Sequence, residues 1–240
     1  MNTRRNFILQ SSLASSAFLV ANPFKSIANT FLPVTGSSVN NNKIIFLHTG
    51  TNSDHRSAHQ QMNAIKKATA NIVMLHTGSQ LKEIPNNLRY DVAINQGQDD
   101  SIKLGDYKIM YKGDIKIGII TASHSEAVSV DKINNLSTYL KKTRDCQIVV
   151  CLSQLGYKNA HQLDDRKLAE QSVNLDLIIS GHATNYSKHT LVAANTNREE
   201  VIIHFASGNG FDFGSIEILF DKKGYKNSIA INNLISRKTA

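Results

Sequence analysis

The sequence predicts an α/β fold. From residue 43 onward, short apolar runs of strand length alternate with amphipathic stretches of helical length, and this alternation is typical of sheets covered by helices. The last apolar runs follow one another without a helix between them, joined by turns such as DKKG at residues 221–224. Strands joined by tight turns run antiparallel, so a mixed sheet is expected.

Nine apolar runs, rich in Ile, Val, Leu, Phe and Tyr, have the length and composition of β-strands. They are residues 43–48, 72–76, 92–95, 107–111, 115–121, 147–152, 175–180, 200–206 and 214–220. Three stretches between them carry apolar residues at spacings of three and four, which predicts helices over residues 57–69, 131–144 and 164–173. Residues 54–56, Asp-His-Arg, suit the N-cap and first turn of the first helix.

The N-terminus resembles a twin-arginine export signal. Arg4 and Arg5 precede a weakly apolar, Ser- and Ala-rich run to about residue 21, and Ser26 and Ala28 offer small residues to a signal peptidase. The run is shorter than the roughly 20 apolar residues that span a bilayer. We therefore expect a signal peptide over 1–28, a linker over 29–42, one domain over 43–235, a periplasmic location and no membrane span after signal removal. An uncleaved signal acting as a membrane anchor is the alternative.

The positive charge belongs partly to this signal. The whole chain has 27 Lys and Arg against 19 Asp and Glu, a formal charge of +8. Residues 1–28 hold three basic residues and no acid, so their removal leaves 24 against 19, or +5. The remaining lysines are dispersed, Trp is absent and aromatic residues make up 7%. A nucleic-acid interface needs a contiguous basic surface with stacking aromatics, so no nucleic-acid partner is expected.

The two cysteines, Cys146 and Cys151, flank an apolar run. If that run is a strand, their odd separation points the side chains to opposite faces, which argues against a disulfide. We expect small buried hydrophobic residues, above all at Cys151.

Five turns that follow predicted strands have an order and spacing that point to one family. Their sequences are LHTGTNSDHR (47–56), LHTGSQ (75–80), YDVAINQGQD (90–99), LSQLGY (152–157) and DLIISGHAT (176–184). In this order they resemble the five signature blocks of calcineurin-like metallophosphoesterases, specifically the N-terminal domain of bacterial 5'-nucleotidases. The resemblance covers nearly all of residues 43–222. It implies a central β-sandwich of mixed sheets flanked by helices, in four layers α/β/β/α.

The chemistry of that family is not matched by the residues present. Family members hold two divalent metals, which activate a hydroxide that hydrolyses phosphate esters. The family's metal-ligand positions fall on Thr51, Ser53, Ser79, Gly97, Gln154, His182 and Thr184, and its catalytic histidine position on Gln98. Of the usual ligands only His182 is retained. Hydroxyls, amides and a glycine do not supply the charge that holds a divalent pair, so no metal cofactor is expected.

The alternative is a single relocated metal. Other candidate ligands lie at or just beyond the ends of the strands: His48, Asp54, His55, His76, Asp99 and His124. Three imidazoles and one carboxylate would satisfy a zinc ion. A histidine at the very end of a strand, such as His48 or His76, is more often a hydrogen-bonded core residue.

The sequence thus predicts an exported 5'-nucleotidase-like protein that is catalytically inactive and acts as a binding or scaffold subunit. The alternative is a divergent metal-dependent phosphoesterase that hydrolyses nucleotides or other phosphate esters. The resemblance also implies a partner, because full 5'-nucleotidases carry a second, C-terminal domain that contacts the base. A separately encoded domain of that type is the expected partner.

Overall fold

The computed structural model describes residues 42–50, 55–77, 90–94, 106–123, 128–157, 162–181, 190–205 and 213–234. The predicted twin-arginine signal and nearly all of the predicted linker lie outside these residues.

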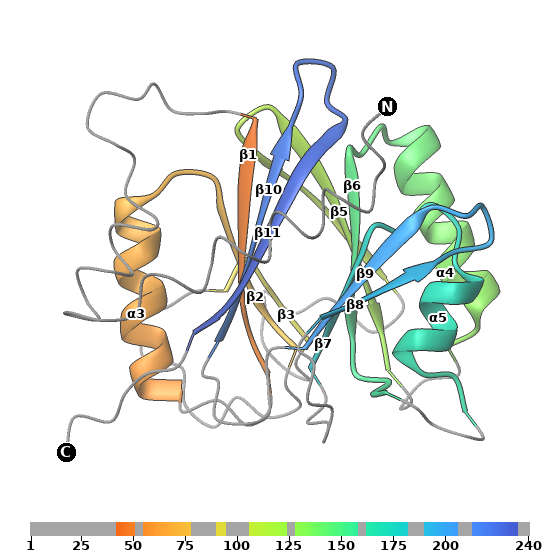
Figure 1. The fold of residues 1–240 in the computed structure, drawn as a ribbon, viewed down its shortest axis with the longest axis horizontal. Helices are drawn as coiled ribbons and strands as arrows, with labels where there is room; N and C mark the ends of the chain where they lie inside the picture. Colours follow the sequence, from red (N-terminus) through yellow and green to blue (C-terminus); the bar gives the residue numbers. More distant parts are fainter. Residues whose placement is uncertain are drawn as a thin grey trace.

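Two mixed sheets pack face to face and are covered by helices on both outer sides (Figure 1). Sheet A contains, in spatial order, β11 (Lys226–Leu234), β10 (Phe213–Phe220), β1 (Lys43–Thr49), β2 (Ile72–His76) and β3 (Val92–Ala93). Sheet B contains β4 (Tyr107–Lys112), β5 (Ile115–Ala122), β6 (Ile148–Ser153), β7 (Leu177–Ser180), β9 (Glu200–Phe205) and β8 (Thr190–Ala194). Helix α3 (His55–Ala68) covers sheet A, and α4 (Val130–Thr138) and α5 (Asp165–Gln171) cover sheet B. The predicted four-layer α/β/β/α arrangement is confirmed.

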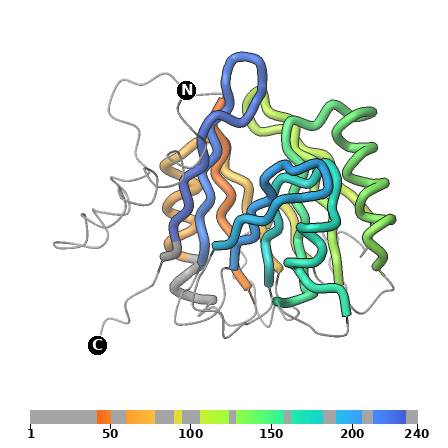
Figure 2. Tube along the Cα trace, turned by 45° about the vertical axis from the view of Figure 1, so that its right-hand side comes forward, coloured from red at the N-terminus to blue at the C-terminus, as the bar shows by residue number. Residues whose placement is uncertain are grey.

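Strand direction brings the carboxyl ends of the parallel strands together. In sheet A, β1, β2 and β3 are parallel and β10 is antiparallel to β1. In sheet B, β5, β6, β7 and β9 are parallel, while β4 and β8 are antiparallel to the strands beside them. Figure 2 shows β1 lying beside the blue C-terminal strands, far from it in sequence. Turns that follow β1, β2, β6 and β7 therefore start from one edge of the sandwich.

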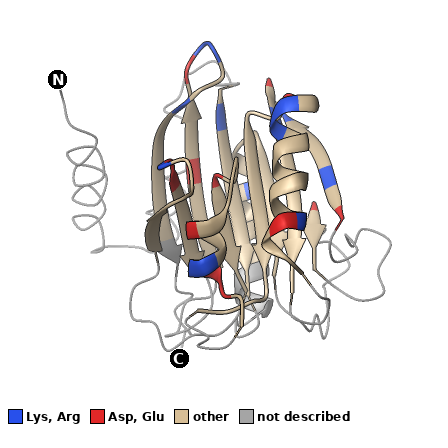
Figure 3. Cartoon of the chain, turned by 90° about the vertical axis from the view of Figure 1, so that its right-hand side faces the viewer, with Lys and Arg blue, Asp and Glu red and all other residues tan. Residues whose placement is uncertain are grey.

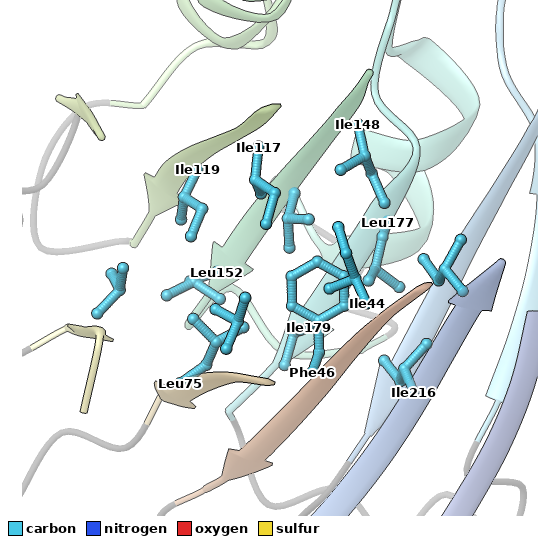
Figure 4. Close-up of a cluster of buried hydrophobic side chains, with 14 of the residues drawn as sticks. Ile44, Phe46, Leu75, Ile117, Ile119, Ile148, Leu152, Leu177, Ile179 and Ile216 are labelled. Carbon is cyan, nitrogen blue, oxygen red and sulfur yellow. The ribbon is translucent and has the colours of Figure 1, made fainter. Parts of the chain in front are cut away.

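The period-two alternation of the strands divides their side chains between three cores. On β1, Ile44 and Phe46 face the other sheet, while Ile45 and Leu47 face α3. Figure 4 shows Phe46 in the middle of the core between the sheets, among residues of both sheets such as Leu75 of sheet A and Ile179 of sheet B. Each such fully buried aliphatic or Phe side chain stabilises the fold by about 1.5–3 kcal/mol. The strands carry near-continuous apolar runs because they are covered on both faces.

The helices begin where short polar residues can cap them. The Ser129 side chain accepts from Lys132 N at the start of α4, and the Asp164 side chain accepts from Lys167 N at the start of α5. The helix predicted over 131–144 is α-helical only to Thr138 and continues as a π-helical segment, Tyr139–Thr143. None of the helices in the described part has both the length and the apolar character needed to cross a membrane.

Two strands of the structure were not predicted. β8 and β11 are additional to the nine predicted strands.

The expected orientation of the two cysteines is wrong. Both cysteines are buried and neither is in a disulfide. Cys146 lies before the first residue of β6 and shares the core under α4 and α5 with Cys151, so their side chains are on the same side of sheet B and not on opposite faces. Burial raises the pKa of the Cys151 thiol, which is therefore protonated.

Candidate functional site

Thr77, the residue after β2, joins the predicted signature blocks at the carboxyl edge of both sheets. Its backbone N–H and its Oγ1 both donate to the Thr49 carbonyl of the first block, at 3.0 Å each. Its own carbonyl accepts from Gln154 Nε2 of the fourth block at 3.1 Å. Gly181 of the fifth block packs on it so closely that an added Cβ would overlap the Thr77 backbone. Four blocks distant in sequence thus meet at one buried threonine.

The third block joins on the α3 side of sheet A. Thr49 Oγ1 lies 2.8 Å from His76 Nδ1 and 3.0 Å from the Tyr90 hydroxyl, so one threonine hydroxyl links an imidazole to a phenol. Ile94 N donates to the His76 carbonyl at 3.0 Å. Burial raises the pKa of Tyr90, so its hydroxyl stays neutral and available for hydrogen bonding. On this side of the edge the three side chains form a buried hydrogen-bonded chain.

The fourth block is fixed by a buried carboxylate from α5. Ser153 Oγ donates to Asp165 Oδ1 and accepts from Leu155 N at 3.1 Å. Asp165 N in turn donates to the Gly156 carbonyl at 2.9 Å. Asp165 is fully buried, and its contacts hold the turn that carries Gln154. The carboxylate therefore shapes the loop beside the site and does not project into solvent.

Two buried imidazoles face each other across the sandwich. The rings of His48 on β1 and His204 on β9 are 4.8 Å apart in an edge-on arrangement. Both lie against Gly214 of β10: a Cβ at this glycine would be 2.5 Å from His48 Nε2 and 2.7 Å from His204 Nε2. His204 Nδ1 is 3.1 Å from Thr190 Oγ1. Burial, and then the nearby His204, lower the pKa of His48 well below its usual value of 6.5.

The lowered pKa of His48 predicts a loss of stability in acid. In the unfolded chain a histidine binds a proton near pH 6.5, whereas native His48 stays neutral. The free energy of unfolding is therefore unaffected above this pH. Below about pH 6.5 it falls by up to about 1.4 kcal/mol per pH unit for one such imidazole. We expect His48→Leu, which is similar in size, to flatten this slope.

Urea unfolding curves at a series of pH values from neutral to mildly acid measure that slope in both proteins. Equal slopes in wild type and His48→Leu would show that His48 titrates normally in the native state. Asp131→Asn on the exposed start of α4 is the control, because it removes a titratable group without touching the imidazole pair.

A divalent metal pair needs several carboxylate, imidazole or amide side chains that converge on one point. Gln154 lies in the described part, and its side-chain nitrogen already donates to the Thr77 carbonyl. Within the described residues no three or more His, Cys, Asp or Glu side chains are placed to hold a metal ion. Of the seven predicted ligand positions the described residues thus include only Gln154, a neutral amide whose nitrogen is already hydrogen-bonded. The other positions, Thr51, Ser53, Ser79, Gly97, Gln98, His182 and Thr184, lie outside the described residues.

The structure describes only some of the candidate ligands of a single relocated metal. His48 and His76 are both fully buried, the first against Gly214 and the second on Thr49. His55 begins α3, and its side chain is outside what the structure describes. Asp54, Asp99 and His124 also lie outside the described residues. Thr49 and Tyr90 were not predicted as site residues, although both stand inside the signature blocks. For Thr49 the available signal was a polar residue directly after the predicted strand 43–48.

Comparison with known proteins agrees with this architecture. No protein-family model and no curated protein sequence matches the chain. Among solved structures it is similar to a 5'-nucleotidase precursor from Thermus thermophilus, with a TM-score of 0.59 and 15% identity over 80% of this chain and 54% of that one. It is also similar to the NAD nucleotidase of Haemophilus influenzae, with a TM-score of 0.61 and 12% identity over 80% of this chain and 49% of that one. The chain thus spans about half the length of the structures that it matches. It has the calcineurin-like metallophosphoesterase fold that 5'-nucleotidases show in their N-terminal domain.

Proposed function

We propose that this chain is an exported metallophosphoesterase-fold protein that lacks phosphoesterase activity and acts as a binding or scaffold subunit. The observation that carries the proposal is the loss of ligand types at the positions that would hold the metals. Six of the seven positions carry a hydroxyl, an amide or a glycine in place of carboxylate, imidazole or asparagine. Two divalent cations close together need anionic oxygens between them, which these residues do not supply.

The hydrogen bonds at the edge of the sheets support the same proposal. The Gln154 side chain bonds the end of β2 to the end of β6, and the Thr49 hydroxyl bonds His76 and Tyr90. These polar groups connect the strands to one another, as expected where a former reaction site has become part of the framework. The surface charge favours no strongly acidic partner, because Lys and Arg are interspersed with Asp and Glu over the described elements (Figure 3).

Metal analysis together with a phosphatase assay tests the proposal. Protein prepared from a periplasmic extract without chelators is expected to contain no stoichiometric Zn, Mn or Fe. It is also expected not to hydrolyse p-nitrophenyl phosphate esters when these ions are added. His182→Ala should change neither result. Two metals per chain, or a phosphatase activity that His182→Ala abolishes, would instead establish the divergent metal-dependent hydrolase.

The proposed scaffold role includes a partner, a separately encoded domain of the 5'-nucleotidase C-terminal type. Its support is that this chain covers only 54% and 49% of the two solved structures that it matches. The same native preparation tests it by size-exclusion chromatography and mass spectrometry. Elution of the exported chain as a single species without such a domain would contradict the partner and leave the metal result standing.

A further inference from the structure

A cavity of about 560 Å³ lies at the amino edge of sheet B, far along the strands from Thr77. It is partly open and is lined by residues before β6 and β7, by the start of β9, and by the hairpin from β10 into the first residues of β11. This volume is within the range of small-molecule sites, roughly 300–1,000 Å³. All of its lining residues are described, and none belongs to the signature blocks of the proposed phosphoesterase-like site except Asp176, which precedes β7.

One part of the lining carries two ammonium groups on a single carboxylate. Asp176, nearly buried, accepts from Lys141 Nζ at 2.7 Å, from Lys226 Nζ at 2.5 Å and from Val149 N at 2.7 Å. Lys141 also donates to the Gln147 carbonyl at 2.9 Å. One negative charge against two positive charges leaves this group with a net charge of +1. Lys141 lies in the helical segment that covers sheet B, whereas Lys226 begins β11 of sheet A. Their shared pairing with Asp176 therefore also holds the β10–β11 hairpin beside the cavity.

The part of the lining at β9 carries the opposite charge. Glu199 and Glu200 both line the cavity, and neither forms an ion pair with a described residue. The turn that presents them is ordered by Asn195, whose Oδ1 accepts from Glu199 N at 2.8 Å and whose Nδ2 donates to Glu199 Oε2 at 3.1 Å. One carboxylate, that of Glu199, is thus held beside the cavity before any ligand arrives, and the exposed Glu200 side chain lies next to it in the lining.

Between these groups the surface is apolar or neutral. Leu175 and Ile202 form part of the lining, and Tyr225, 69% exposed, stands at its hairpin side. A small anion would be attracted by the lysines but repelled by the glutamates. A small cation would be attracted by the glutamates but repelled by the lysines. A ligand with both charges, separated by a neutral body, satisfies both ends at once.

We propose that this cavity binds a short zwitterionic peptide. Its carboxylate lies against Lys141 and Lys226, and its terminal ammonium lies against Glu199 and Glu200. The site does not depend on the proposed loss of phosphoesterase activity, because it lies at the other edge of the fold. Charge-assisted hydrogen bonds at both ends supply the affinity, and the removal of either charge from the ligand removes one of them.

Isothermal titration calorimetry of the full chain with three matched ligands tests this. The ligands are tri-alanine, its N-acetyl derivative without the ammonium, and its C-terminal amide without the carboxylate. Tri-alanine is expected to bind, and each blocked form to bind roughly tenfold or more weakly, as for the loss of one charge-assisted hydrogen bond. The absence of heat with tri-alanine, or equal affinity for the blocked forms, overturns the proposal.

Variants then assign each end of the ligand. Glu200→Gln, at the exposed start of β9, should weaken tri-alanine binding but leave the affinity of the N-acetyl form unchanged, because that form has no ammonium to lose. Lys226→Met should weaken tri-alanine but not the amide. Lys222→Met, on the same hairpin but outside the lining, is the control and should bind as wild type. Circular dichroism of each variant confirms folding, and a folded Glu200→Gln protein with wild-type discrimination among the three ligands overturns the assignment.

Discussion

Replacement of Gly181 by alanine is expected to lower the free energy of unfolding by about 3 kcal/mol. A Cβ at this position would lie 2.5 Å from both the carbonyl carbon and the Cβ of Thr77, closer than real Cβ contacts. The Thr77 backbone cannot move away easily, because its N–H donates to Thr49 and its carbonyl accepts from Gln154. The contact between the two sheets at the signature blocks would have to open. Urea unfolding at neutral pH measures the loss.

Gly118→Ala is the matched control. It is also a buried glycine, but its added Cβ would meet the flexible Leu140 side chain at 2.9 Å and Cys146 Sγ at 3.3 Å. Side-chain ends can shift, so we expect a loss of about 1 kcal/mol. If Gly181→Ala cost no more than Gly118→Ala, the close packing of the fifth block on Thr77 would not constrain the protein.

The Asp176→Asn variant is expected to lose about 3 kcal/mol of stability. The substitution preserves the shape of the side chain but removes the negative charge between two lysines. Asp176 Oδ2 also accepts from Val149 N at 2.7 Å, and an amide nitrogen placed there would face a donor. Two ammonium groups would remain close together and uncompensated. Chemical unfolding monitored by circular dichroism gives the difference.

The lysines provide the comparison that separates charge from packing. In Lys141→Met or in Lys226→Met the carboxylate keeps one ammonium partner, and both lysine side chains are partly exposed, 22% and 32%. Each change should therefore cost about 1 kcal/mol or less. If Asp176→Asn lowered the free energy of unfolding by as little as either lysine variant does, the carboxylate would not be balancing two charges.

Most of the strands that were predicted are buried on both faces, and the partly exposed edge strand β4 is an exception. Runs such as those of β1, β6 and β7 are apolar at nearly every position, because they face a second sheet on one side and a helix on the other. The two missed strands lie at the outer edges of the sheets. β8 is a half-exposed TLVAA, and in β11 Ile229 and Ile231 alternate with Ser228, Ala230 and Asn232. That alternation was the available signal, and asparagine's poor strand propensity obscured it.

The candidate site could be predicted in its position but not in its contacts. The order of the signature blocks predicts which turns meet at the carboxyl edge of the sandwich, and the meeting of Thr49, Gln154 and Gly181 at Thr77 agrees with it. The contacts of each side chain depend on which residues of the opposite sheet pack against it. The sequence of a single strand does not contain that information. His48 was considered as a metal ligand, yet it faces His204 of the other sheet and Gly214 of the neighbouring strand. The cavity at the amino edge was missed because its charges come from separated turns.

The position of β1 between β10 and β2 also has a consequence for how the chain folds. β1 is the first strand of the described residues, yet it needs β10 as a neighbour. The Lys43–Glu217 ion pair between them joins residues 174 positions apart. Contacts so distant in sequence form slowly, because a long loop must close before they contribute energy. On the ribosome, one edge of β1 stays open until nearly the whole chain has been synthesised. During that interval the apolar strand is exposed to pairing with other chains, so we expect aggregation to compete with folding chiefly before residues 213–220 emerge.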